Sequence, residues 1–583
     1  MKLFEVSWEV CNKVGGIYTV ISSKSNYIKK FFKEFFFIGP YLREDNEEFY
    51  EKEIPEEYQE IVKIMSERGV KVHYGKWIKN NTPTFLIEFR ELFKEKNKIK
   101  TELWEHFKVD SLFSSFDFEE PVVWSYAVGM FLEEIAKKFE NLNEKIIAHF
   151  HEWLCGAGLL YLKIVKAKVG TVFTTHATVL ERALASKKVK FNFQENPEEI
   201  ARQIGVIDKY TLEKQTILNA DAFTTVSELV AESCEKIFGR KADYITINGL
   251  DLKSLPNLEE IPLFHKKNKE KIKDFVKSFF YPYYYFDVDN SLFYFISGRY
   301  EINSKGIDLF IKALGKLNKK MVLEKEDKTI VVFIFIPSGN YEENEEVIEN
   351  LLLFKTIKER IKEHFPEIED KILNYFISQK KENFFPEDFS LLLKRYLRVF
   401  RRGGIPPIST HKVKEDYIIS QIEKEGLKNS EEDRVKIIYY PLYLSEKDGL
   451  LNLDYYEATS AFHLGIFPSF YEPWGYTPLE SAALGVPAIT TDYSGFGKYV
   501  LNNLRFYDNE ERGVIVIKRE NKSDEQVIDE LVEDMHNFLS LSKNKRIKNK
   551  IIAETLALRL SWEFLIENYL NAYNLAVEKR FGI

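Results

Sequence analysis

The chain has 583 residues, 45% of them hydrophobic and 30% charged, so it is long enough for two folded domains and too apolar to be disordered. Its 91 acidic and 83 basic residues leave a formal net charge of −8, which argues against a protein that binds duplex nucleic acid. Three widely spaced cysteines support neither a disulfide framework nor a structural zinc site, and without a signal-like N-terminus or a long apolar run we expect a cytoplasmic protein with no membrane segment.

Residues 1–260 alternate strand-like and helix-like segments, which predicts a Rossmann-like domain with a parallel sheet. The first strand is followed by Lys13-Val14-Gly15-Gly16 and a helix over 17–30. Paired glycines let the backbone approach an oxyanion and Lys13 adds a charge, although an ordinary tight turn explains the same residues. Asn248 and Gly249 form the turn after the last strand of this half. The expected strands are residues 3–10, 35–38, 84–88, 146–153, 169–175, 221–225 and 245–247.

Histidines lie where two of these strands end. Strand 146–153 carries His149 and His151, and His176 follows strand 169–175. In open α/β sheets ligands bind at this end of the strands. We expect His149 and His151 to face opposite sides of their strand, and no third ligand follows at a suitable spacing, so no metal site is predicted.

Residues 261–559 predict a second Rossmann-like domain, entered through a charged and aromatic linker over 264–290. Its first strand, 293–297, leads into a loop with Arg299, Glu301 and Lys305 and then a helix over 307–316. Arg299 and Lys305 are suitably spaced to clamp a diphosphate, whose developing charge needs fixed positive charge, although charged loops without a function are common. Further strands are expected at 331–336, 435–440, 461–468 and 486–490.

A helical insertion over residues 340–425 interrupts the second domain. Its apolar seam consists of Val347, Leu351, Phe354, Ile361 and Phe365. Pro366 and Pro386 are expected at the starts of two further helices, 367–377 and 387–401. Such an insertion is either a lid or a subunit contact, and we favour a contact that assembles a homo-oligomer. Amphipathic helices over 526–540 and 551–579 close the chain.

Residues 469–480, Ser-Phe-Tyr-Glu-Pro-Trp-Gly-Tyr-Thr-Pro-Leu-Glu, join the strand 461–468 to a helix. Free amides and the positive end of the helix dipole would attract an anion at this junction. Glu472 and Glu480 flank the junction, and carboxylates bind sugar hydroxyls. A nucleotide sugar needs one acid for the sugar, one for the ribose and amides for the diphosphate. A surface turn with two solvated glutamates explains the same spacing about equally well.

Taken together, these motifs resemble glycogen synthases of the animal and fungal type, which are retaining glucosyltransferases with two facing Rossmann-like domains, the GT-B arrangement. The resemblance covers nearly the whole chain and rests on residues 9–18, 149–153, 173–178, 223–228, 298–301 and 469–480. It implies an α/β fold with a helical insertion for tetramer assembly and a last helix, about residues 560–583, that packs back on the first domain.

The resemblance also implies roles for individual residues. Arg299 and Lys305 would neutralise the donor diphosphate, Glu472 would hold the transferred glucose, and His151 would lie beside the reacting carbon. Glu480 and Tyr476 would serve the nucleotide. The other expected substrate-binding residues are Lys13, Gly15, Gly16, Asn248, Glu301, Trp474, Gly475 and Thr477.

The implied reaction transfers glucose from UDP-glucose or ADP-glucose to the non-reducing end of glycogen or another α-1,4-glucan, with retention and without a metal or other cofactor. The sequence does not rank the two donors. Two alternatives stay open: a related enzyme with a small acceptor such as a sugar phosphate, and a catalytically silent glucan-binding scaffold. A scaffold has no use for a diphosphate clamp, which argues against the second.

Two departures from the family pattern have consequences. Lys13 stands where eukaryotic members have arginine, which leaves the nucleotide preference open. Where those members carry an arginine-rich helix that binds glucose-6-phosphate, this chain keeps only part of the charge. We therefore expect weak, salt-sensitive binding of a dianion and an enzyme that is active without it. The matched positions read Lys543, Asn544, Arg546, Lys550, Ile552 and Thr555.

Overall fold

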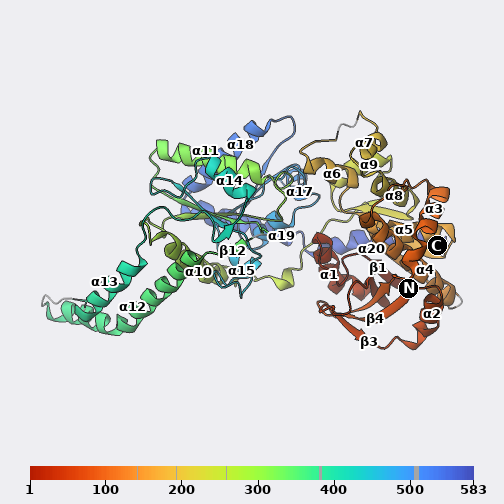
Figure 1. The fold of residues 1–583 in the computed structure, drawn as a ribbon, viewed down its shortest axis with the longest axis horizontal. Coiled ribbons are helices and arrows are strands. Elements are labelled where there is room, and N and C mark those ends of the chain that lie inside the picture. Colours follow the sequence, from red (N-terminus) through yellow and green to blue (C-terminus); the bar gives the residue numbers. More distant parts are fainter. Residues whose placement is uncertain are drawn as a thin grey trace.

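The computed structural model describes residues 1–582 except 141, 143, 192–193, 258, 340, 380–383, 386 and 505–510. Two α/β bodies lie side by side along the long axis, and a pair of long helices projects from the C-terminal body (Figure 1). Both chain ends lie on the N-terminal body (Figure 1). The expected fold class, two Rossmann-like units with a helical insertion in the second, is confirmed.

The N-terminal body contains a nine-stranded sheet in the order β3-β4-β5-β2-β1-β6-β7-β8-β9. Its pairs from β5 through β9 are parallel, whereas β3 and β4 add an antiparallel edge that the sequence analysis missed. The central strands β1, β6 and β7 are buried throughout, as expected for a sheet covered by helices on both faces. The strands are β1 Lys2–Val6, β2 Glu34–Pro40, β3 Phe49–Lys52, β4 Lys71–Trp77, β5 Thr82–Glu88, β6 Ile146–His151, β7 Val169–Thr175, β8 Ala222–Thr225 and β9 Tyr244–Ile245.

Helices alternate with these strands, which is why the sheet is mostly parallel. Short 3-10 turns lie at Lys29–Phe31, Leu92–Glu95, Trp153–Cys155 and Leu252–Ser254. The helices are α1 Gly16–Ile28, α2 Glu56–Glu67, α3 Lys96–Phe107, α4 Phe116–Glu140, α5 Gly156–Ile164, α6 Val179–Ser186, α7 Pro197–Gln203, α8 Ile207–Asn219 and α9 Glu228–Phe238.

The C-terminal body contains a six-stranded parallel sheet in the order β14-β11-β10-β15-β16-β17. The strand expected over 461–468 is shorter than predicted, because only three of its residues pair within the sheet. The strands are β10 Leu292–Ser297, β11 Ile330–Phe335, β14 Val435–Tyr440, β15 Leu464–Ile466, β16 Ala488–Thr491 and β17 Val514–Ile517.

The segment expected to be a linker over 264–290 begins with helix α10, Ile261–Phe280. Ile272, Phe275 and Phe279 recur at helical spacing and are buried against the second sheet, which explains why this charged stretch folds as a helix. Among the described helices, none offers an apolar stretch long enough to cross a bilayer. The other helices of this body are α11 Ile307–Leu323, α14 Tyr417–Lys424, α15 Tyr455–Ser460, α16 Tyr476–Ala483, α17 Gly495–Asn503, α18 Asp524–Ser540 and α19 Lys543–Leu558.

The projecting insertion consists of α12, Glu345–Ser378, and α13, Glu387–Phe400, with a short antiparallel ribbon of β12, Tyr341–Glu343, and β13, His411–Val413, at its base. The expected helix start at Pro366 was wrong. The helix α12 runs through this proline, which removes one backbone donor without ending the helix. Pro386 lies outside the described residues.

The last helix, α20, Trp562–Phe581, returns to the N-terminal body and packs on β7, β8 and α1. The single helix expected over 551–579 is therefore two helices, with Ser561 capping α20. The chain passes between the two bodies twice, near Leu250 and near Leu560. These two segments lie side by side, because Leu250 N donates to Leu560 O at 2.9 Å and Trp562 N donates to Leu250 O at 3.3 Å.

Candidate active site

The carboxyl ends of the two sheets face each other. Ser227, which follows β8, donates its hydroxyl to the carbonyl of Pro473 at 2.7 Å. Lys190, beyond α6, donates to the hydroxyl of Tyr493 at 2.8 Å, and Lys188 pairs with Asp308 at the start of α11. Because open α/β sheets bind ligands at their carboxyl edges, the candidate site lies between these edges.

The loop between β10 and α11 brings Lys305 to Glu472, which is 167 positions away in the sequence, and the two side chains form an ion pair. Gly306 makes this approach possible. It has φ +68°, and a Cβ there would lie 2.0 Å from the carbonyl oxygen of Pro468, so only glycine fits. Phe470 N donates to the carbonyl of Ser304 at 2.8 Å and fastens the two loops together.

The backbone holds Glu472 independently of its side chain. Its N–H donates to the carbonyl of Tyr493 at 3.0 Å, and its carbonyl accepts from Gly495 N at 2.9 Å. The carboxylate is partly exposed, so it can reach a ligand as well as Lys305. Arg299, the second expected cation, is exposed and pairs with Glu301 at 2.8 Å.

The expected nucleotide side contains a buried carboxyl group. Glu480 accepts a hydrogen bond from the Tyr456 hydroxyl at 3.1 Å, and burial raises the pKa of Glu480 to about 7. Tyr476 donates to the carbonyl of Gly249 in the N-terminal body at 3.3 Å. The neighbouring Asn248 is buried, and its side-chain oxygen has no hydrogen-bond partner among the described residues.

The other residues expected near the nucleotide differ in exposure. Trp474 is buried, with its ring 6.0 Å from that of Phe496, so its side chain belongs to the packing of the C-terminal body. Gly475 has φ +108° and begins α16, where the left-handed backbone favours glycine. Thr477, in the first turn of α16, is half-buried.

The turn expected to bind an oxyanion already holds an internal carboxylate. One oxygen of Glu9 accepts from both Gly15 N and Tyr18 N at 2.8 Å. Burial raises the pKa of Glu9, although these two amides lower it. Lys13 and Gly16 are exposed. An oxyanion at this turn would therefore compete with Glu9 for the start of α1.

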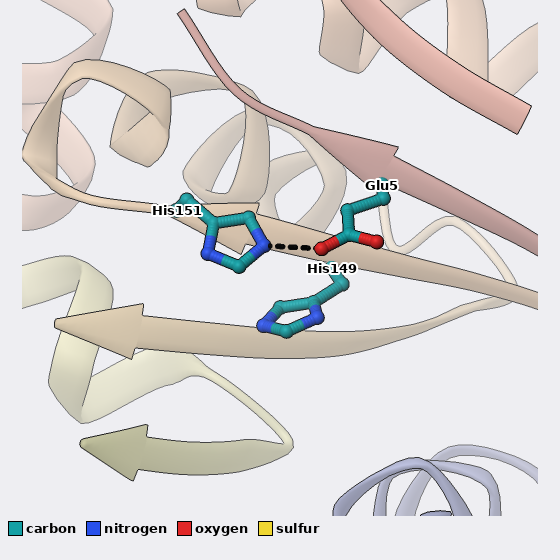
Figure 2. A group of neighbouring side chains, drawn as sticks. All are labelled: Glu5, His149 and His151. Atoms are coloured by element: carbon teal, nitrogen blue, oxygen red, sulfur yellow. Dashed lines mark hydrogen bonds and ion pairs between the residues drawn. The ribbon is translucent and has the colours of Figure 1, made fainter. Parts of the chain in front are cut away.

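The histidines are arranged differently from the prediction. His149 and His151 share one face of β6, with ring centroids 4.1 Å apart (Figure 2). The expectation of opposite faces was wrong, because residues two apart on a strand point the same way. His151 is 1% exposed, with Nε2 2.8 Å from Glu5 Oε1 and Nδ1 2.9 Å from His176 Nε2. His151 is thus a buried neighbour of His176 and presents no free ring nitrogen.

Ligand atoms of Glu5, His149 and His151 lie within 4.8 Å of one another, which raises the question of a metal. The ammonium of Lys24 lies 2.6 Å from Glu5 Oε1 and already supplies the positive charge. A metal ion beside this buried ammonium would be repelled. These residues therefore do not fit a metal site.

Sequence reasoning missed Arg182 of α6. Its side chain is exposed, and its guanidinium interacts electrostatically with Glu152 of the N-terminal body and with Tyr471 and Glu301 of the C-terminal body. Arg182 of the N-terminal body and Arg299 of the C-terminal body both act electrostatically on Glu9, so the two arginines belong to one neighbourhood. The available signal was its position in the first helix after strand β7, just beyond the polar strand tip.

A second cationic cluster lies at the amino edge of the second sheet, where His463 precedes β15. Lys269 of α10 contacts His463, and the ammonium of Lys550 lies 3.1 Å from His265 Nε2. Burial, Lys269 and Arg546 together lower the pKa of Lys550 to about 7. Among the described residues, no carboxylate forms an ion pair with any of these cations. We expected weak dianion binding from the charges of α19 alone. The cluster also includes Lys269 of α10, which adds a positive charge.

The comparisons with known proteins agree with one another. The sequence profile described as "Glycogen synthase" matches residues 5–582. The chain is 33% identical to glycogen [starch] synthase isoform 2 of Saccharomyces cerevisiae, over 99% of this chain and 86% of the yeast protein. It is also 33% identical to the liver glycogen [starch] synthase of Homo sapiens, over 99% of this chain and 84% of the human one.

Solved structures show the same fold. The catalytic domain of starch synthase IV from Arabidopsis thaliana, bound to ADP and acarbose, matches with a TM-score of 0.53 and 14% identity over 99% of both chains. The trehalose-6-phosphate synthase OtsA matches with a TM-score of 0.51 and 11% identity, over 98% of this chain and 99% of the other. At these identities the likeness concerns the fold alone.

Proposed function

This chain belongs to the glycogen synthase family of retaining GT-B glycosyltransferases, and we propose that it transfers glucose from UDP-glucose or ADP-glucose to the non-reducing end of an α-1,4-glucan. The observation that carries the proposal is the ion pair of Lys305 and Glu472 at the facing sheet edges. It places a cation suited to a leaving diphosphate beside a carboxylate suited to sugar hydroxyls. No finding favours a small acceptor or a silent scaffold.

In the proposed reaction the bond between glucose C1 and the phosphate oxygen breaks, and the acceptor hydroxyl attacks from the same face. The proton of that hydroxyl passes to the departing phosphate oxygen. Lys305, Arg299 and Arg182 stabilise the negative charge that develops on the diphosphate, so the proposal needs neither a metal nor another cofactor. Glu472 holds the glucose, and Glu480 accepts from the ribose.

A donor competition assay tests this proposal. The protein is incubated with glycogen and equal amounts of the two radiolabelled donors, and the label bound to polymer is counted for each donor. Polymer-bound label from at least one donor is expected, and their ratio gives the preference. Label recovered only in small products, or the same polymer label with a Lys305→Ala protein, would contradict the proposal.

The insertion is proposed to assemble a homo-oligomer, with a tetramer favoured by the family resemblance. Phe365, Leu373, Phe376 and Ile377 form an exposed stripe on α12, and Phe376 and Ile377 are each 74% exposed. Leu351, expected in the contact seam, is instead buried in the core of the C-terminal body. Large apolar side chains are rarely left exposed in one continuous stripe.

Charging this stripe is expected to break the assembly. The double variant Phe376→Glu with Ile377→Glu should sediment as a smaller species with unchanged circular dichroism, because a buried carboxylate without a partner is costly at an interface. Lys362→Glu, on an exposed part of the same helix, is the matched control and should sediment like the wild type. An unchanged mass for the double variant would make the insertion a lid or an appendage.

The cationic cluster of Lys269, Arg546 and Lys550 is proposed to bind glucose-6-phosphate. A phosphate dianion stabilises the charged form of Lys550, so its binding takes up protons. Since the pKa of free Lys550 is about 7, the affinity should fall as the pH rises from 7 to 9, where the phosphate stays doubly ionised. Calorimetry across this pH range measures the effect.

Lys550→Met should weaken this binding strongly, whereas Lys548→Met on the same helix, whose ammonium pairs with Glu511, should not. If Lys550→Met and Lys548→Met bind glucose-6-phosphate equally well, the cluster of Lys269, Arg546 and Lys550 is not its binding site. Basal activity without the ligand is still expected, because the pair of Lys305 and Glu472 forms without it. Initial rates with and without millimolar glucose-6-phosphate measure both.

A further inference from the structure

Four buried side chains form one line from the interior of the N-terminal body to a strand tip. Lys24 of α1 pairs with Glu5 of β1 at 2.6 Å, and Glu5 Oε1 lies 2.8 Å from His151 Nε2 (Figure 2). His151 Nδ1 lies 2.9 Å from His176 Nε2. Lys24 and Glu5 are 0% exposed, His151 is 1% and His176 is 6% exposed, so His176 is the outer end of the line.

The line determines where each proton sits. A carboxylate only accepts, so His151 carries its proton on Nε2. Burial lowers the pKa of His151 despite the help of Glu5, and burial with His151 and Lys24 holds the pKa of His176 well below its usual value, so both rings are neutral. Neutral His151 then has a lone pair on Nδ1 and accepts from His176 Nε2. His176 is left with a lone pair on Nδ1.

We propose that Lys24 and Glu5 are positioning residues that fix this tautomer, so that His176 Nδ1 accepts a hydrogen bond from a hydroxyl of the bound sugar. The inference rests on the proposed function for the identity of that hydroxyl. It assigns a role to a buried ion pair that the transfer reaction itself does not use.

The positive charge of Lys24 excludes the opposite tautomers, in which His151 and His176 would carry their protons on Nδ1. A buried carboxyl group without a cation takes up a proton. Protonated Glu5 could donate to His151 Nε2, which would reverse both hydrogen bonds and leave His176 Nδ1 as a donor. Lys24 lowers the pKa of Glu5 against the effect of burial, and its ammonium lies 4.2 Å from the Tyr569 ring centroid.

Other charged and polar groups contact or act on the histidines, but none of them takes over the role of Lys24 in keeping Glu5 ionised. Arg182 of α6 also acts electrostatically on His176 and lowers its pKa. Tyr573 of α20 lies 2.9 Å from His149 Nδ1, while His149 Nε2 lies 2.6 Å from the Thr174 hydroxyl. Both partners of His149 are neutral, so this second histidine does not set the charge on Glu5.

The tautomer is read directly by ¹⁵N NMR of protein labelled only at histidine, with the His176 signals assigned from their loss in His176→Gln. Wild-type His176 is expected as the Nε2–H form throughout the neutral range. In Glu5→Gln and in Lys24→Met we expect a mixture that includes the Nδ1–H form. A wild-type His176 with its proton on Nδ1 overturns the proposal, and this reading does not depend on any enzymatic activity.

Kinetics separate a positioning role from a purely structural one. Glu5→Gln should lower kcat roughly 10- to 100-fold and change the donor KM little, because a wrong histidine tautomer spoils the reacting geometry without removing binding groups. In a protein that already carries His176→Gln, adding Glu5→Gln should not lower kcat any further. Additive losses would overturn the proposal.

Lys2→Met is the matched control. Lys2 is a buried lysine on the same strand as Glu5 and pairs with Glu34, with no link to the histidines. It should lower the thermal midpoint as Lys24→Met does, yet leave the tautomer and kcat unchanged. If Glu5→Gln does not fold, Lys24→Met gives the same reading. Identical kcat losses in Lys2→Met and Lys24→Met would count against the inference.

Discussion

Replacing Glu472 by alanine is expected to lower kcat by roughly 100-fold or more while the affinity for UDP or ADP becomes no weaker. The side chain is proposed to contact the glucose and not the diphosphate. Removing it also frees Lys305 from its only carboxylate partner among the described residues, so the diphosphate gains an unpaired cation. Turnover with saturating donor and calorimetry with the nucleoside diphosphate measure the two effects separately.

The loop should survive this change. The backbone of Glu472 is held by Tyr493 and Gly495 at 3.0 and 2.9 Å, and these hydrogen bonds do not involve the carboxylate. Glu525→Ala, which removes a surface partner of Lys316 in the same body, is the control and should keep the wild-type rate. Near-wild-type turnover in Glu472→Ala, or loss of diphosphate binding, would remove Glu472 from its proposed role.

Lys305→Ala is expected to lower kcat by roughly 100-fold as well, and to weaken nucleoside diphosphate binding. Its ammonium is largely buried beside Glu472, so it lies in a preorganised place where charge developing on a leaving phosphate would be stabilised. The loss should be smaller with a donor whose leaving group is a better anion, because less charge stabilisation is then needed. Rates with natural and activated donors measure this dependence.

Lys316→Ala serves as the control for Lys305→Ala, since it removes an exposed lysine from the helix that follows the same loop. It should leave both kcat and diphosphate affinity unchanged. If Lys305→Ala has an unchanged kcat, Lys305 does not stabilise the leaving diphosphate and its loop is a charged turn without a catalytic role.

The alternation of strands and helices could be predicted because buried parallel strands read as apolar runs, and β10, β11 and β14 are of this kind. The β3 and β4 edge could not, because its strands are partly exposed and polar. Helix α10 was predicted as a linker because its charged residues outnumber the apolar ones that recur every three or four positions. The apolar seam expected on α12 included Leu351, which is buried in the core of the C-terminal body. Helical spacing alone does not distinguish a face that packs in the core from one that is exposed.

Within the site, sequence reasoning identified Lys305 and Glu472 separately, each after a strand of the second domain, but did not predict their ion pair. The pair joins two loops 167 positions apart, which meet because the carboxyl ends of parallel strands share one sheet edge. Sequence reasoning also missed contacts between other distant elements: Arg182 comes from α6, and the cluster around Lys550 takes Lys269 from α10. The sequence named His151 but not its neighbour His176, because no motif shows that their rings, from two neighbouring strand tips, lie within hydrogen-bond distance.

The return of α20 to the first sheet sets an order of folding during synthesis. Residues 292–517 supply the whole second sheet, so that body can close while the chain is still being made. The first sheet emerges earlier from the ribosome, but the helix that covers β7 and β8 is made only after every strand of the second sheet. The half that is synthesised first is therefore completed last, and a nascent chain halted before residue 562 exposes the apolar face that Trp562, Tyr569 and Tyr573 would cover.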